Sequence, residues 1–148
     1  MRHILIIISL LLFTPPLLGD SHSGKILYGW ETSSGVLLRE FGDKDIHPQY
    51  KGDVENEKPN GLGIMTFPDG RKYLGEWENG RMGGHGTFTF PSGYKYVGEY
   101  KGGKMWNVKK YNKDGKYVGE YKNGEVWNGI VYDKNANVVG NWVNGVKQ

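Results

Sequence analysis

Apolar and polar positions alternate in short runs along the chain after residue 49, and this period of two is typical of β-strands. Residues 73–77 (YLGEW) place Tyr73 and Trp77 on one face and the intervening side chains on the other. Residues 86–90 (GTFTF) alternate again, and between the two runs lies Asn79-Gly80, a pair that tolerates the positive φ angles of tight hairpin turns. The pattern predicts an antiparallel hairpin over residues 73–90.

This hairpin pattern is repeated along the chain. Its first glycine recurs at spacings of 23, 23, 21 and 21 residues, and the aligned positions are Gly52, Gly75, Gly98, Gly119 and Gly140. The repeat divides the array into residues 50–72, 73–95, 96–116, 117–137 and a partial unit, 138–148. A second glycine, in the turn, follows at Gly80, Gly103, Gly124 and Gly145, whereas the first unit has Glu57. Because short connections join antiparallel neighbours, successive hairpins should form one continuous meander.

The repeated pattern Y-x-G-x-[WY]-x-x-G-x-x-x-G-x-G resembles the MORN repeat from Tyr50 to Gln148. The second unit carries it most fully, at Tyr73, Gly75, Glu76, Trp77, Gly80, Gly84 and Gly86. The resemblance implies an all-β fold, an elongated single-layer antiparallel sheet with one hairpin per repeat, and a role as a scaffold, in some cases at membranes. The third and fourth units carry Trp106-Asn107 and Trp127-Asn128, and the G-x-G pair is lost at Asn107 and Lys109, so we expect hairpins of a different shape there.

The first residues of the chain predict a secretory signal peptide. A basic start precedes the apolar run Ile4 to Phe13, and Pro15-Pro16 ends it. This run is short of the roughly 20 apolar residues that a membrane span needs, which disfavours an uncleaved anchor. The expected cleavage follows Gly19, with Ser21 or Ser23 as alternatives. We therefore expect residues 1–19 to direct the protein to a secreted or periplasmic location.

Residues 20–49 are less regular than the array. Lys25 to Trp30 and Val36 to Phe41 read as strands around Ser33-Ser34-Gly35, and Gly29 precedes Gly52 by 23 residues. The segment is either a degenerate repeat that caps the array or an ordinary leader hairpin. Repeat arrays need such caps, because each unit buries surface only against its neighbours.

The amino-acid composition further limits which fold classes are possible. The 148 residues include 24 glycines and no cysteine, and the 5 Trp, 10 Tyr and 5 Phe supply abundant apolar surface. Glycine at this frequency disfavours helices, while the aromatic content argues against simple disorder. Without disulfides, packing and backbone pairing must supply all the stability.

We find no pattern that predicts catalysis, a cofactor or a metal site. Gly98 to Lys104 approaches a phosphate-binding loop, but Met105 stands where the motif needs Ser or Thr. The recurrent carboxylates Glu76, Glu99 and Glu120 are expected to form a solvated row that pairs loosely with lysines. The sequence predicts a protein that is not an enzyme.

Charge is distributed unevenly along the chain. Residues 20–78 hold seven basic and eleven acidic side chains, net −4, whereas residues 95–122 hold eight and three, net +5. Aromatic residues interleave with the lysines of this basic stretch and just beyond it, which makes a candidate interaction surface. That surface consists of Tyr96, Tyr100, Lys101, Lys104, Trp106, Lys109, Lys110, Tyr121, Trp127 and Trp142.

Two functions of different classes follow. The first is a non-catalytic scaffold that binds a protein partner or self-associates through the C-terminal edge strand, because the array breaks off after residues 142–145 (WVNG). The alternative is peripheral binding of anionic lipid or an acidic polymer through residues 95–122. Nucleic acid is disfavoured by the expected location outside the cytoplasm.

Overall fold

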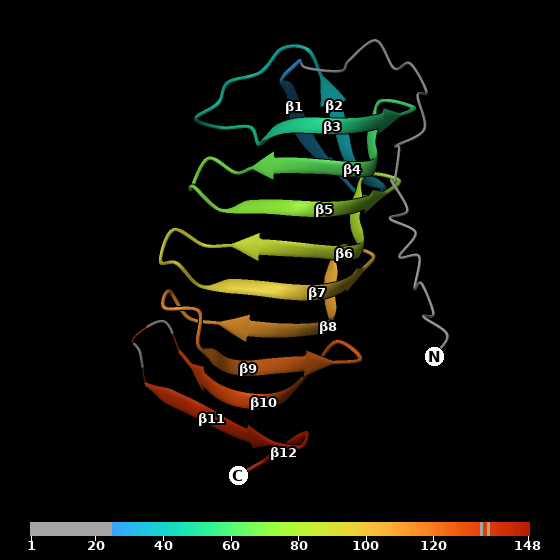
Figure 1. The fold of residues 1–148 in the computed structure, drawn as a ribbon. Coiled ribbons are helices and arrows are strands. Elements are labelled where there is room, and N and C mark those ends of the chain that lie inside the picture. Colours follow the sequence, from blue (N-terminus) through green and yellow to red (C-terminus); the bar gives the residue numbers. More distant parts are fainter. Residues whose placement is uncertain (1–24, 134, 136) are drawn as a thin grey trace, which may run out of the picture.

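The computed structural model describes residues 25–133, 135 and 137–148, and it confirms the expected all-β fold (Figure 1). The 12 strands found in the described residues all belong to one open antiparallel sheet. Their order across the sheet is β12-β11-β10-β9-β8-β7-β6-β5-β4-β3-β1-β2. The expected signal peptide, residues 1–19, lies outside the described residues.

The strands follow one another as hairpins. The first two, β1 (Leu27–Thr32) and β2 (Gly35–Arg39), form what we call the N-terminal hairpin. The array after it consists of β3 (Gln49–Glu55), β4 (Lys58–Thr66), β5 (Lys72–Glu78), β6 (Arg81–Thr89), β7 (Lys95–Lys101), β8 (Lys104–Tyr111), β9 (Tyr117–Lys122), β10 (Glu125–Tyr132), β11 (Val138–Val143) and β12 (Val146–Lys147). From β3 to β12 each strand pairs with its neighbour in the sequence, as expected for a meander.

The hairpin turns have the backbone geometry that their sequences require. Asn79 and Gly80 both have positive φ, 50° and 80°, and the pairs that begin at Asn123 and Asn144 repeat this geometry. Positive φ costs glycine little and asparagine less than most residues, which is why Asn-Gly recurs there. Glu57 takes the same conformation, φ 59°, without that freedom.

The two repeat lengths fold differently, as expected from the loss of G-x-G. In β5–β6, Gly75 pairs with Gly86 and Trp77 pairs with Met82, so residues 83–85 bulge opposite Glu76. In β7–β8 the bulge is shorter, because Glu99 pairs with Asn107 and Tyr100 with Met105, which leaves Trp106 alone as the extra residue. The pair β9–β10 repeats the shorter bulge.

Glycines pair directly with one another across five neighbouring strands. The column runs Gly52–Gly63–Gly75–Gly86–Gly98 from β3 to β7. Tyrosine rings fill the space above it: a Cβ added to Gly63 or Gly86 would collide with the ring of Tyr50 or Tyr73, respectively. The column ends in β8, where Val108 pairs with Gly98. Glycine is therefore needed wherever a tyrosine ring lies across the backbone.

The core lies on one face of the sheet, which we call the inner face. Tyr50, Met65 and Tyr73 are at most 1% exposed there, and Val108 is the last buried hydrophobic side chain among the described residues. The N-terminal hairpin packs against the beginning of this face, where Leu27 and Leu38 join the same core. In Figure 1 this hairpin passes behind β3, β4 and β5.

The N-terminal hairpin is not simply one more hairpin in line. In the described part of the chain it pairs with the edge strand of the array at two positions, Leu27 with Tyr50 and Tyr28 with Gln49. Beyond them β2 crosses the ends of the array hairpins, where Val36 N–H donates to Gly80 O at 2.8 Å and Leu38 N–H to Glu57 O at 2.7 Å.

The C-terminal end differs from the sequence expectation of a last strand without a successor. After the turn at Asn144-Gly145 the chain returns as β12, which pairs Lys147 with Trp142 and Val146 with Val143. The few residues after the turn suffice for these two pairs. They leave most of the outer edge of β11 without a neighbouring strand in the described part of the sheet.

Candidate functional site

The structure distributes the basic aromatic stretch over both faces of the sheet. Tyr96 and Lys110 pair across β7–β8 on the inner face, whereas Lys109 pairs with Val97 on the opposite, outer face. Tyr100 and Tyr121 also lie on the inner face: Tyr100 is buried against Tyr73, with 5.0 Å between ring centroids, and the Tyr121 ring is 6.4 Å from that of Tyr96. The candidate interaction surface proposed from the sequence is therefore divided between the two faces of the sheet.

Several of these lysines lie over aromatic rings. Lys110 Nζ is 4.8 Å from the Tyr94 ring centroid, Lys101 Nζ is 4.9 Å from that of Trp106, and Lys122 Nζ is 4.6 Å from that of Trp127. Such cation–π contacts contribute about 0.5–1 kcal/mol each at exposed sites. Lys147 lies over Trp142 in the same way, at 5.5 Å. These lysines therefore stabilise the neighbouring aromatic rings.

The tryptophans after the turns have a structural role. Trp106 O accepts the Gly124 N–H at 3.0 Å, and Trp127 O accepts the Gly145 N–H at 2.8 Å. The Trp127 ring also lies so close to Gly145 that an added Cβ there would meet ring atoms at 2.8 Å. Each tryptophan thus fixes the turn of the following hairpin.

Asparagine side chains link successive hairpins, which the sequence analysis did not foresee. Asn107 donates to Glu99 Oε2 at 2.7 Å and accepts the Asn123 N–H at 3.1 Å, so it joins its own hairpin to the next turn. Asn128 does the same for Glu120 and Asn144, and Asn60 for Glu55 and Asn79. The hairpin β5–β6 has Gly83 at the position of Asn60, and the turn that follows it is Gly102-Gly103 instead of an Asn-Gly pair. This correspondence between the asparagine and the next turn can already be seen in the sequence.

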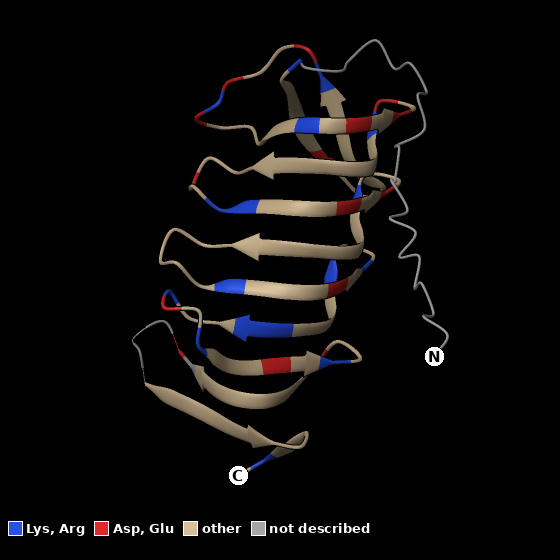
Figure 2. Ribbon diagram, viewed as in Figure 1, with Lys and Arg blue, Asp and Glu red and all other residues tan. Residues whose placement is uncertain are grey.

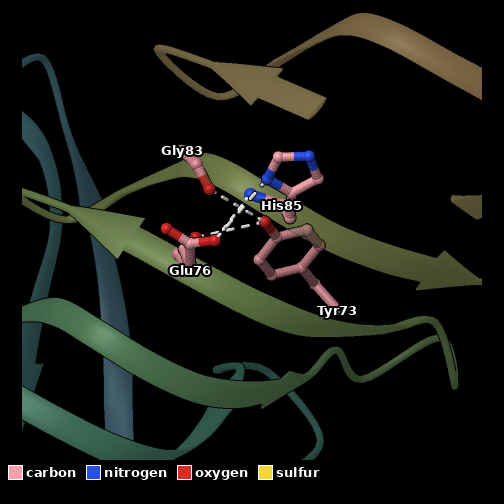
Figure 3. Close-up of polar contacts among 4 residues, drawn as sticks. All are labelled: Tyr73, Glu76, Gly83 and His85. Carbon is pink, nitrogen blue, oxygen red and sulfur yellow. Dashed lines mark hydrogen bonds and ion pairs between the residues drawn. The ribbon is translucent and has the colours of Figure 1, made fainter. Parts of the chain in front are cut away.

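The recurrent carboxylates bind the bulges of their own hairpins, in contrast to the expected loose pairing with lysine. Glu76 Oε1 accepts the His85 N–H at 3.0 Å (Figure 3), and Asp53 Oδ2 accepts the Leu62 N–H at 2.8 Å. Figure 2 shows these acidic positions aligned near one end of β3, β5 and β7. The one lysine pair in the described part of this row joins Lys122 to Glu120 at 3.7 Å.

Figure 3 shows three side chains of types that occur in catalytic sites, those of Tyr73, Glu76 and His85, but they are not arranged as a catalytic cluster. Tyr73 Oη donates to the Glu76 carbonyl at 3.1 Å and also lies 3.4 Å from Gly83 O. Burial, aided by the Glu76 charge, raises the pKa of Tyr73, so its hydroxyl stays a donor. His85 Nδ1 is 3.8 Å from Glu76 Oε1, with the imidazole 75% exposed. The cluster therefore holds the bulge in place.

The described residues contain neither a group of three metal-ligating side chains nor a helix that could span a membrane. A cleft of about 250 Å³ opens instead where the N-terminal hairpin ends on the inner face. Its walls include Val36 from the hairpin, Met65 and Trp77 from the sheet, and the turn Gly102-Gly103. The cleft lies at the boundary between covered and uncovered parts of the inner face.

A family model of the MORN repeat matches residues 50–70 and 73–93. These two stretches of the chain are MORN repeats. No curated protein matches it. The two matched MORN repeats form the hairpins β3–β4 and β5–β6 with their following connections, which are the hairpins with the longer bulge and the glycine column. MORN repeats are generally modules that contact proteins or membranes, and the family is not enzymatic.

Proposed function

We propose that this MORN-repeat chain is a non-catalytic scaffold that binds a protein partner outside the cytoplasm. The observation that carries the proposal is the uncovered sheet of the last hairpins. In the described residues of β9 to β12 no hydrophobic side chain is buried, and Tyr117, Val138 and Val146 are 45%, 59% and 61% exposed. A sheet that exposes apolar residues on this scale is typical of a surface that a partner covers.

The experiment is crosslinking and pull-down of the protein from its native compartment, combined with sequencing of the mature N-terminus. We expect a mature chain that begins at Asp20, after the expected cleavage, and a partner crosslinked to residues 117–148. A chain that keeps residues 1–19, or crosslinks that fall on β3 to β6 alone, would contradict the proposal.

Self-association through the C-terminal edge is a second form of the same function. It is favoured because β12 is short and pairs with two residues of β11, so the rest of this edge of β11 is open to a strand of a second copy. Deletion of residues 138–148 should then convert an oligomer to a monomer in sizing experiments. A full-length chain that is itself monomeric at high concentration would remove this form.

Binding of anionic lipid remains the alternative, favoured by the net charge of +5 over residues 95–122. It predicts sedimentation with anionic liposomes that weakens as salt is raised, because exposed charges are screened over about 8 Å at physiological ionic strength. Absence of sedimentation at low salt would exclude it.

A further inference from the structure

The N-terminal hairpin shows how an extended segment binds to the array. Two N–H groups on β2 donate to the carbonyls of Gly80 and Glu57, at 2.8 and 2.7 Å. Both acceptors occupy the second position of a two-residue turn with positive φ. The donors, Val36 and Leu38, are two residues apart, and both side chains pack on the core. The turns thus present a row of carbonyls that a strand can use as a partner edge.

This row continues beyond the hairpin. Gly103 and Gly124 occupy the same turn position, with φ of 83° and 84° against 80° for Gly80. Their N–H groups donate to the preceding hairpin, at Met82 O and Trp106 O, as Gly80 donates to Pro59 O. Within the described residues, however, no hydrogen bond reaches the carbonyls of Gly103 or Gly124. The acceptors are repeated, while the strand that uses them stops after Gly80.

There is room for a further segment at this point. The cleft of about 250 Å³ lies between the hairpin end and the turn Gly102-Gly103, with Phe67, Trp77 and Met82 among its apolar lining residues. A Cβ added to Gly102 or Gly103 would meet no atom within 4 Å. The space beside the first free carbonyl is therefore open and partly apolar.

The surroundings of the free carbonyls are positively charged. Lys101 and Lys104 flank the turn Gly102-Gly103, and Lys122 precedes the next turn, where Glu125 is the one flanking acid. Figure 2 shows blue segments where β7 ends and β8 begins, on either side of this turn, within the stretch of net charge +5. A segment that docks here is favoured if it is acidic.

We infer that the carbonyls of Gly103 and Gly124 bind an extended acidic segment of a protein partner, which continues the line of β2 along the array. Alternate residues of that segment donate N–H groups to the turns and turn apolar side chains inward, as Val36 and Leu38 do. The residues between them carry the acidic groups toward Lys101, Lys104 and Lys122. This inference rests on the proposed function, because it names the chemistry of the partner.

The test uses a fluorescently labelled synthetic peptide of alternating valine and glutamate, titrated with the purified chain and followed by anisotropy. We expect saturable binding, weakened about tenfold or more in the triple variant Lys101→Glu, Lys104→Glu, Lys122→Glu, because three attractive charges become repulsive. The matched control reverses Lys72, Lys95 and Lys109, which lie in the strands away from these turns, with the same change of net charge. Equal weakening by both variants would overturn the inference.

A second peptide isolates the backbone contribution. Methylation of its valine N–H groups removes the donors to the turn carbonyls and leaves every charge in place, so binding should again fall by about tenfold or more. Unchanged binding of the methylated peptide would overturn the inference, as would binding of anionic phosphatidylserine vesicles but not of the parent peptide. If a partner crosslinks to the native protein equally well after the Lys101, Lys104 and Lys122 reversals, the inference fails while the proposed function stands.

Discussion

The same motif position has opposite surroundings at the two ends of the array. Tyr73 in the second repeat is 0% exposed, whereas Tyr117, which begins the fourth, is 45% exposed. Tyr73 lies over a glycine column and within a cluster that includes Leu27 and Leu38 of the N-terminal hairpin. Among the described residues, the Tyr117 ring lies over no such glycine column and outside this cluster. A MORN-like sequence therefore specifies a strand and a face, but burial requires a second layer and space for the ring.

The largest difference between the two regions is expected for these tyrosines. Tyr73→Ala should lower the free energy of unfolding by about 3–5 kcal/mol, because it removes a fully buried ring and its hydrogen bonds. Tyr117→Ala should change it by less than about 0.5 kcal/mol, as is usual at exposed positions. Urea unfolding followed by tryptophan fluorescence measures both. Similar losses for the two variants would show that the C-terminal hairpins also possess a core.

The glycine column provides the next test. Gly86→Val should destabilise by about 3 kcal/mol, because its side chain would collide with the Tyr73 ring, although Val108 occupies the next place after the column without conflict. Thr87→Val on the outer face is the control and should be neutral within about 0.5 kcal/mol. A neutral Gly86→Val would mean that the Tyr73 ring can move aside at no cost. Thermal and urea unfolding should agree on the order of the variants.

A smaller, stabilising effect is expected at the first turn. Glu57→Gly should raise stability by about 1 kcal/mol, because glycine adopts its positive φ of 59° without steric cost. The change also removes the exposed ion pair with Arg39 at 2.9 Å, so Arg39→Ala serves as the control for that loss. A lower unfolding midpoint for Glu57→Gly than for Arg39→Ala would refute the expectation.

The smallest effect concerns the asparagine link that is missing at Gly83. Gly83→Asn should raise the free energy of unfolding by about 0.5–1 kcal/mol more than Gly83→Ala does, because its side-chain oxygen can accept the Gly102 N–H as Asn60 Oδ1 accepts the Asn79 N–H one repeat earlier. Gly102 has a φ of 57°, close to the 50° of Asn79, so the two turns have similar backbone geometry at the donor residue. Urea unfolding of the two variants measures the difference, and a Gly83→Asn variant no more stable than Gly83→Ala would contradict the expectation.

Much of the fold could be predicted because it is local. The period of two and the Asn-Gly turns predict the hairpins, and the glycine spacing predicts their order, both of which are confirmed in the single antiparallel sheet. The strands expected around Ser33-Ser34-Gly35 are present as β1 and β2. The candidate surface was less predictable, because adjacent residues such as Lys109 and Lys110 face opposite sides of a strand.

The sequence by itself determined that this chain forms hairpins, where they turn and which glycines recur. Only the tertiary structure decided that the N-terminal hairpin crosses the inner face, that the glycine column ends at Val108 and that, within the described residues, no hydrogen bond reaches the turn carbonyls of Gly103 and Gly124. The reason is the range of the interactions. Turns and alternation depend on residues within one repeat, whereas the contact of Val36 with Gly80 joins residues 44 positions apart and depends on how the twisted sheet brings them together.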